Sequence, residues 1–89
     1  MLERELTVSN RLGLHARAPA KLVQLLSGFR ANATLVAKGR EVNAKSIMGV
    51  MLLAAGQGTP VTVRVQGEDE ADAMAAVVDL FERRFDEDS

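Results

Sequence analysis

The sequence contains no cysteine, no tryptophan and no tyrosine, and it has a single histidine among its 89 residues. The lack of cysteine excludes a disulfide scaffold, a thiolate zinc site, an iron–sulfur cluster and a cysteine nucleophile. One histidine excludes a multi-histidine site, so we expect no bound metal. Three phenylalanines leave few rings for stacking on bases. Because the basic residues are also scattered, nucleic acid is not expected as a partner.

Long apolar runs are also missing. The longest stretch, 47–55, is much shorter than the roughly 20 residues that a membrane helix needs, and the charged residues 1–5 do not resemble a signal peptide. We therefore expect no membrane insertion and a cytoplasmic location. Hydrophobic residues make up 47% of the chain and charged residues 26%. These values predict one globular domain over residues 1–89, with little room for a deep substrate cavity.

The net charge of −1 is spread unevenly along the chain. Residues 1–45 contain eight Lys/Arg and three Asp/Glu, a net charge of +5. Residues 46–89 contain three Lys/Arg and nine Asp/Glu, a net charge of −6. Such asymmetry could give a basic face that meets an acidic partner, and plain solvated surface is the alternative.

Hydrophobic patterning predicts four strands and three helices. The strands are expected at 2–8, 33–37, 40–44 and 60–66, and the helices at 16–27, at 46–53 and from Asp69 or a neighbour onward. Four short strands cannot bury both faces in so small a chain. The order β-α-β-β-α-β-α therefore predicts an α+β two-layer domain, with helices on one face of a mostly antiparallel sheet.

Several residues suggest how these elements begin and end. Gly28 is expected to end the first helix in a left-handed conformation, and Lys38-Gly39 to form a tight hairpin turn. The Ser46 hydroxyl can cap the second helix. The apolar stripe of the last helix runs to Phe85, and residues 86–89 are expected to be a frayed tail.

The single histidine, His15, lies where the first predicted helix begins. No nearby serine or cysteine offers a nucleophile for it to activate, so a functional His15 would act alone, as a nucleophile or a proton donor. The unpaired N–H groups at the start of a helix form an anion site, and the Arg17 guanidinium can hydrogen-bond phosphoryl oxygens in pairs. These features suit a phosphohistidine. An ordinary surface or capping histidine is the alternative that composition and spacing leave open.

Two motifs make the sequence recognisable. Gly13-Leu14-His15-Ala16-Arg17 is similar to the active-site motif of the HPr family, the histidine-containing phosphocarriers of the phosphoenolpyruvate-dependent sugar phosphotransferase system. Asn43-Ala44-Lys45-Ser46-Ile47-Met48-Gly49-Val50-Met51 is similar to the family's regulatory-serine segment. The turn 56–59 and the valine-rich strand after it also match, so the resemblance covers essentially the whole chain. It implies an open-faced sandwich, in which a four-stranded antiparallel sheet carries three helices on one side.

The resemblance also implies roles for individual residues. His15 would accept a phosphoryl group on Nδ1 from phosphorylated enzyme I and pass it to a histidine of an EIIA domain. Arg17 and the backbone amides of Ala16 and Arg17 would steady that group. Ser46 would be phosphorylated by an HPr kinase/phosphorylase in organisms that have one. A partner-binding patch would comprise Leu14, Ile47, Met48, Met51 and Leu52. Such a chain is a carrier rather than a true catalyst, needs no cofactor, and is expected to be a monomer.

One departure from the family pattern concerns the proline, which usually follows the arginine directly. Here Ala18 intervenes and the proline is Pro19. If His15 were the helix cap, Pro19 would remove the N–H that bonds the His15 carbonyl, and it would bias Ala18 away from helical angles. We therefore expect the first turn to be loosened or to start late, which would shift Arg17 relative to His15.

Two other functions remain as alternatives at this point. The first is a purely regulatory binding module on the same fold, which would act through Ser46 and the apolar patch. The second is an unrelated small α+β domain that binds a metabolite or stabilises a complex. Within the phosphocarrier hypothesis, the sequence leaves open whether the chain serves sugar uptake or a mainly regulatory, nitrogen-related branch.

Overall fold

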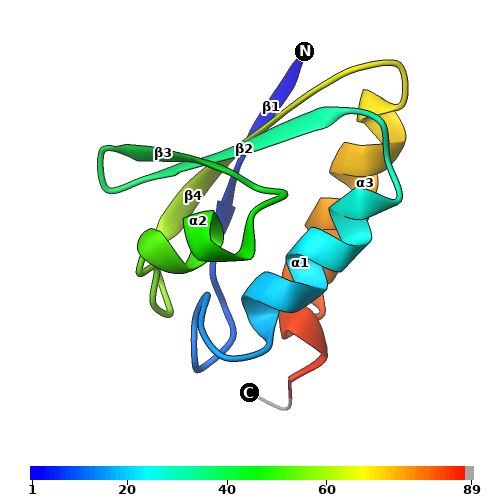
Figure 1. Cartoon of the computed structure of the whole chain (residues 1–89). Coiled ribbons are helices and arrows are strands. Elements are labelled where there is room, and N and C mark those ends of the chain that lie inside the picture. Colours follow the sequence, from blue (N-terminus) through cyan, green and yellow to red (C-terminus); the bar gives the residue numbers. More distant parts are fainter. Residues whose placement is uncertain (88–89) are drawn as a thin grey trace.

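A computed structural model describes residues 1–87 and confirms the predicted open-faced sandwich (Figure 1). The elements are β1 (Leu2–Thr7), α1 (Ala18–Ser27), β2 (Asn32–Ala37), β3 (Arg40–Asn43), α2 (Ile47–Leu52), β4 (Pro60–Gln66), α3 (Glu70–Glu82) and the short 3₁₀ turn η1 (Arg84–Asp86). The four strands form one sheet in the order β1-β4-β2-β3, and every neighbouring pair is antiparallel. The three α-helices cover one face of this sheet (Figure 1).

The core lies between the sheet and these helices. Strand β4 has the bounds that its alternation predicts, and Val61, Val63 and Val65 are fully buried. The helices contribute buried side chains such as Leu22 of α1 and Val77 of α3. Within residues 1–87, no helix is long and apolar enough to cross a membrane.

The predicted hairpin turn at Lys38-Gly39 forms, and an unpredicted contact holds the start of α3. Lys38 and Gly39 both have positive φ, 53° and 77°, which is the pattern of the two-residue turn that suits a twisted hairpin. Asp69 precedes α3, but its carboxylate makes no hydrogen bond to that helix. Instead it accepts from the backbone N–H groups of Arg30 and Ala31, both at 2.8 Å. Asp69 therefore ties the start of α3 to the loop between α1 and β2.

The first helix ends at Gly28 as predicted, but Gly28 does not adopt a left-handed conformation. Gly28 follows α1 with φ −79° and ψ −3°, which is a right-handed rather than a left-handed geometry. Its N–H donates to the Leu25 carbonyl at 3.2 Å, and the Phe29 N–H donates to the Leu26 carbonyl at 3.0 Å. The last turn thus tightens and satisfies its own carbonyls, so a left-handed cap is not needed.

The end of the last helix also differs from the prediction. Helix α3 ends at Glu82, before Phe85, although Phe85 is fully buried as the apolar stripe predicts. The chain reverses through three consecutive residues of positive φ, Arg84 (56°), Phe85 (55°) and Asp86 (61°). This turn returns the Phe85 ring to Phe81, with ring centroids 4.9 Å apart.

The expectation of a frayed tail is wrong for residues 86 and 87. Asp86 pairs with Lys21 at 3.3 Å, and the Glu87 carboxylate accepts a hydrogen bond from Asn10 at 3.0 Å. Residues 88 and 89 lie outside the described part of the chain. The C-terminal end of the described chain therefore packs back onto α1 and onto the loop before it.

Candidate functional site

His15 is exposed in the loop that connects β1 to α1. After it, Ala16 adopts a left-handed conformation with φ 57°, which bends the chain sharply into the helix. Within residues 1–87, the backbone N–H groups of Ala16 and Arg17 have no hydrogen-bond acceptor. The exposed imidazole is thus followed directly by two unpaired backbone donors, which is the local arrangement that an anion requires.

The predicted late start of the first helix is confirmed. Helix α1 begins at Ala18 rather than Ala16, and its N-cap is Arg17 rather than His15. Pro19 is the second residue of α1, where an N–H group would have no partner within the helix, so the proline costs no hydrogen bond. The expected bias of Ala18 away from helical angles is wrong. Ala18 lies in the helix, and its N–H donates to the His15 carbonyl at 3.3 Å.

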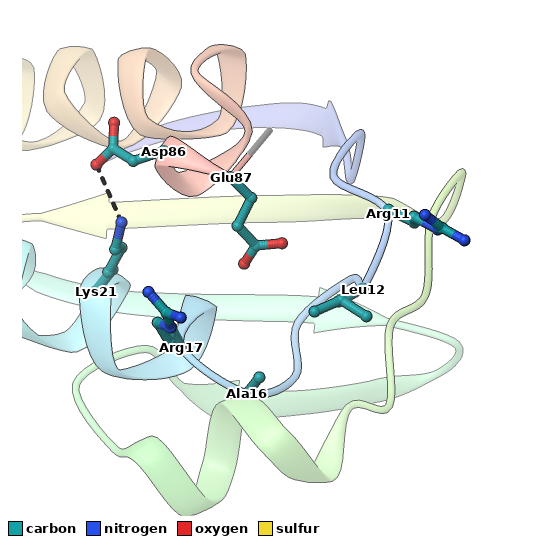
Figure 2. Close-up of a pocket in the computed structure, with 7 residues that line it drawn as sticks. All are labelled: Arg11, Leu12, Ala16, Arg17, Lys21, Asp86 and Glu87. Atoms are coloured by element: carbon teal, nitrogen blue, oxygen red, sulfur yellow. Dashed lines mark hydrogen bonds and ion pairs between the residues drawn. The ribbon is translucent and has the colours of Figure 1, made fainter. Parts of the chain in front are cut away.

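Next to Ala16 and Arg17, a pocket of about 490 Å³ gathers charged side chains from distant parts of the sequence, and His15 is not among the residues that line it. Figure 2 shows its lining residues, which are Arg11, Leu12, Ala16, Arg17, Lys21, Asp86 and Glu87. Lys21 is paired with Asp86, whereas Arg17 forms no ion pair within residues 1–87. The Arg17 guanidinium therefore keeps its hydrogen-bond donors available for a ligand.

The sequence alone did not indicate most of this pocket. Arg11, Lys21, Asp86 and Glu87 belong to it through the tertiary fold, because the reversal after α3 brings the last two back. Leu12 is 56% exposed beside the site. Leu14, two residues further along the same loop, is fully buried, so no signal in the sequence indicated which leucine would be exposed.

Ser46 caps α2 as predicted. Its backbone is extended (φ −118°, ψ 118°), and its Oγ accepts a hydrogen bond from the Gly49 N–H at 3.1 Å. The Ser46 carbonyl also accepts from the Val50 N–H at 3.0 Å. Because the hydroxyl is only half-buried, a small group added to its oxygen would lie at the protein surface.

Helix α2 exposes an apolar surface. Four of its side chains are accessible: Ile47 (44%), Met48 (72%), Met51 (45%) and Leu52 (59%). We call these residues the α2 patch. Helix α2 lies beside the beginning of α1 (Figure 1). The expectation for Leu14 is wrong, because its side chain is fully buried and its N–H donates to the Ala55 carbonyl at 2.8 Å, so it offers no surface to a partner.

Two basic side chains of the β2–β3 hairpin support the α2 patch. Lys38 Nζ donates to the Ala54 carbonyl at 2.9 Å, and Arg40 Nη1 donates to the Leu52 carbonyl at 3.1 Å. Carbonyls at the end of a helix lack partners within the helix, and cationic side chains stabilise them. The hairpin therefore fixes the end of α2 from which the patch projects.

Comparison with known proteins identifies the family of this chain. Residues 2–83 match the family model described as the PTS HPr component phosphorylation site. The chain belongs to the HPr family. The phosphocarrier protein HPr of Xylella fastidiosa strain Temecula1 is 70% identical over 89 residues, which are the full length of both chains. The HPr of Cupriavidus necator is 53% identical over 98% of each chain. The chain is thus an HPr-type phosphocarrier of the phosphotransferase system.

Solved HPr structures have the same fold. The HPr-C-His of Thermoanaerobacter tengcongensis superposes with a TM-score of 0.96 at 42% identity, over 100% of both chains. A structure described as an HPr dimer from the same organism has a TM-score of 0.78, again at 42% identity, and covers 98% of this chain and 100% of its own. The order of helices and strands found here is therefore that of HPr.

Proposed function

We propose that His15 accepts a phosphoryl group from phosphorylated enzyme I and passes it to a histidine of an EIIA domain. The observation that supports this most directly is the exposed imidazole next to the N–H groups of Ala16 and Arg17 and near the Arg17 guanidinium in the sequence, all of which lack a partner within residues 1–87. Phosphoryl transfer depends mainly on positioning and charge neutralisation, which a loop and one helix start can supply. A chain of this size needs no further machinery.

The transfer proceeds at Nδ1 of the neutral ring. Its lone pair forms a bond to phosphorus while the bond from phosphorus to the enzyme I histidine breaks, and the leaving ring takes that electron pair back. The other ring nitrogen of His15 gives up its proton to solvent, and the leaving ring takes up one proton, so both rings end neutral. The two amides and Arg17 donate hydrogen bonds to the phosphoryl oxygens. Transfer to EIIA reverses these roles. The chain is consumed and regenerated, so it acts as a carrier and not as an enzyme.

The α2 patch is the surface on which enzyme I and EIIA dock. Methionine side chains are flexible and polarisable, so Met48 and Met51 can adapt to two different partners. An exposed apolar surface of this kind is typical of an interaction site. We propose that the carrier is a monomer, which leaves this surface free for its partners. Its cytoplasmic location stays a prediction.

Ser46 is the regulatory site in this proposal. An HPr kinase/phosphorylase would attach phosphate to the Oγ that now accepts from Gly49. The phosphate would then lie next to the exposed Ile47 and would place negative charge at the edge of the α2 patch. Docking would weaken, because the partner would have to desolvate that charge. A purely regulatory module would need neither His15 nor Arg17, and the chain has both.

Transfer of the phosphoryl group from this chain to an EIIA domain distinguishes a carrier from a regulatory module. The chain is first phosphorylated with enzyme I and labelled phosphoenolpyruvate, purified from enzyme I, and then mixed with an EIIA domain. A carrier loses its label to EIIA within the mixing time. Label that stays on the chain with several EIIA domains, each active with a control carrier, would contradict the proposal.

A further inference from the structure

The side chain of Asn10 is fully buried in the loop between β1 and α1, and it is the one buried polar side chain among residues 1–87. Its Nδ2 donates to the Gly13 carbonyl at 2.8 Å and to Glu87 Oε1 at 3.0 Å, while its Oδ1 has no partner in that range. Reversing the amide would turn the oxygen toward two acceptors. The two hydrogen bonds therefore fix the orientation of Asn10.

The first of these bonds holds the peptide group that joins Gly13 to Leu14, one residue before His15. The carbonyl of this Gly13–Leu14 peptide accepts from Asn10, and its N–H donates to the Ala55 carbonyl at 2.8 Å. Gly13 has φ 70°, and a Cβ added there would lie 2.5 Å from the Ala55 oxygen, so the two segments are in close contact. With Leu14 fully buried as well, this peptide sets the direction in which the chain enters His15.

The second bond depends on the turn after α3. We call residues 84–87 the C-terminal strap. Its first three residues have positive φ, an unfavourable backbone conformation for residues other than glycine. Tertiary contacts compensate: Phe85 is buried against Phe81, and Lys21 Nζ donates to the Phe85 carbonyl at 2.8 Å. Figure 2 shows the Glu87 side chain of the strap on the same pocket as Arg17 and Leu12.

We propose that Asn10 and Glu87 are positioning residues for phosphoryl transfer, with the C-terminal strap holding the Gly13–Leu14 peptide, and thus His15, through Asn10. Neither residue touches the phosphoryl group. The bond between Asn10 and Glu87 has a charged acceptor, which makes it stronger than a neutral one. This inference rests on the proposed function of His15 and adds the part of the fold that aligns it.

The kinetic test uses the full chain with Glu87→Ala. Loss of the carboxylate frees Asn10, so kcat for phosphorylation by enzyme I is expected to fall roughly tenfold. KM should stay unchanged, because the α2 patch is untouched. Glu87→Gln keeps an acceptor oxygen and should restore most of the rate. Glu82→Ala removes an exposed carboxylate at the end of α3 and is the matched control. Loss of rate in the control as well would contradict a specific role for Glu87.

A second measurement does not depend on activity. The Leu14 N–H should exchange with solvent roughly tenfold faster in Glu87→Ala than in Glu82→Ala, because Asn10, which holds the Gly13–Leu14 peptide, loses one of its own two hydrogen bonds. Asn10→Ala should show the same change if it folds. Unchanged Leu14 exchange together with unchanged kcat in Glu87→Ala would overturn the proposal. Failure of the proposed function itself would show separately, as an unaltered chain that enzyme I does not phosphorylate.

Discussion

At the scale of single residues, the site depends on where unpaired hydrogen-bond donors are left. Ala16 bends the chain, and the amides of Ala16 and Arg17 then lack acceptors within the described chain. Pro19 does not disturb this arrangement, because it occupies a helix position whose N–H would be unpaired in any case. The departure from the usual proline position is thereby accommodated by a helix that starts at Ala18, which is the late start that the position of the proline predicted.

Arg17 should be important for transfer but not for folding. Its side chain makes no hydrogen bond within residues 1–87, so Arg17→Ala should leave the free energy of unfolding nearly unchanged. Phosphorylation by enzyme I should slow by roughly a hundredfold, the usual effect of removing one donor from a charge-stabilising site. Stopped-flow transfer kinetics would measure this. Arg30→Ala, an exposed arginine at the other end of α1, should transfer normally, and equal loss in both variants would contradict the role of Arg17.

Substitutions at Ser46 can separate the effect of negative charge from the effect of helix capping. Asp and Asn are both good N-cap residues, whereas a residue that cannot cap would cost about 1 kcal/mol. Ser46→Asp should therefore fold normally but raise KM for enzyme I roughly tenfold, because it adds negative charge beside the α2 patch. Ser46→Asn keeps the cap without the charge and should retain the original KM. A normal KM for Ser46→Asp would refute the coupling between Ser46 and docking.

At the scale of elements, local patterns predict the structure where local physics decides it. The alternation in β4 and the capping serine of α2 predict their elements to within a residue or so, because burial on one face and one hydroxyl determine them. The ends of α1 and α3 are different. Ala16 becomes left-handed, and the reversal after Glu82 forms only because Phe85 and Lys21 have tertiary partners. Such contacts leave no local signal in the sequence.

The function of the α2 patch can be tested with a single added charge. Met48→Lys should raise KM for enzyme I roughly tenfold and leave kcat near its original value, because the lysine impairs docking but not chemistry. Ala75→Lys adds the same charge to an exposed position of α3 and should have no effect, because helix α1 lies between α3 and α2 (Figure 1). A KM that both substitutions raise equally would point to a general charge effect and against the patch.

At the scale of the whole molecule, the fold rearranges the charges of the sequence. Three basic residues of the first half, Arg11, Arg17 and Lys21, meet at one pocket. The pocket also receives Asp86 and Glu87 from the acidic half. The resemblance of the sequence to the HPr family predicted roles for His15, Arg17, Ser46 and the exposed methionines. The sequence could not predict that Asp86 and Glu87 line the pocket or that Leu14 is buried, because both depend on the packed fold.

Acid should lower the free energy of unfolding, because two carboxylates at the start of α3 become protonated. Hydrogen bonds from the Arg30 and Ala31 amides hold the pKa of Asp69 below its ordinary value of 3.8, and the bond from the Gly67 amide, with help from the N-terminal amine, lowers the pKa of Glu70 from 4.5. The unfolded chain therefore binds protons more readily than the folded one. The stabilisation is complete above these ordinary values and is lost as the pH falls below them.

Urea unfolding measured at about pH 7 and at about pH 3 checks this linkage. The chain should be less stable at the lower pH. Asp69→Asn should be less stable than the unaltered chain at neutral pH, and should lose less on acidification. An Asp69→Asn variant with the same pH dependence as the unaltered chain would show that other groups cause the acid sensitivity.

The most direct test of the central claim is the intact mass of the protein after incubation with enzyme I, magnesium and phosphoenolpyruvate. The account predicts a gain of one phosphoryl group that is labile to acid and absent from a folded His15→Ala variant. No gain, with an enzyme I that phosphorylates a control carrier, would contradict the assignment of His15 as the phosphoryl acceptor. An equal gain in His15→Ala would contradict it as well.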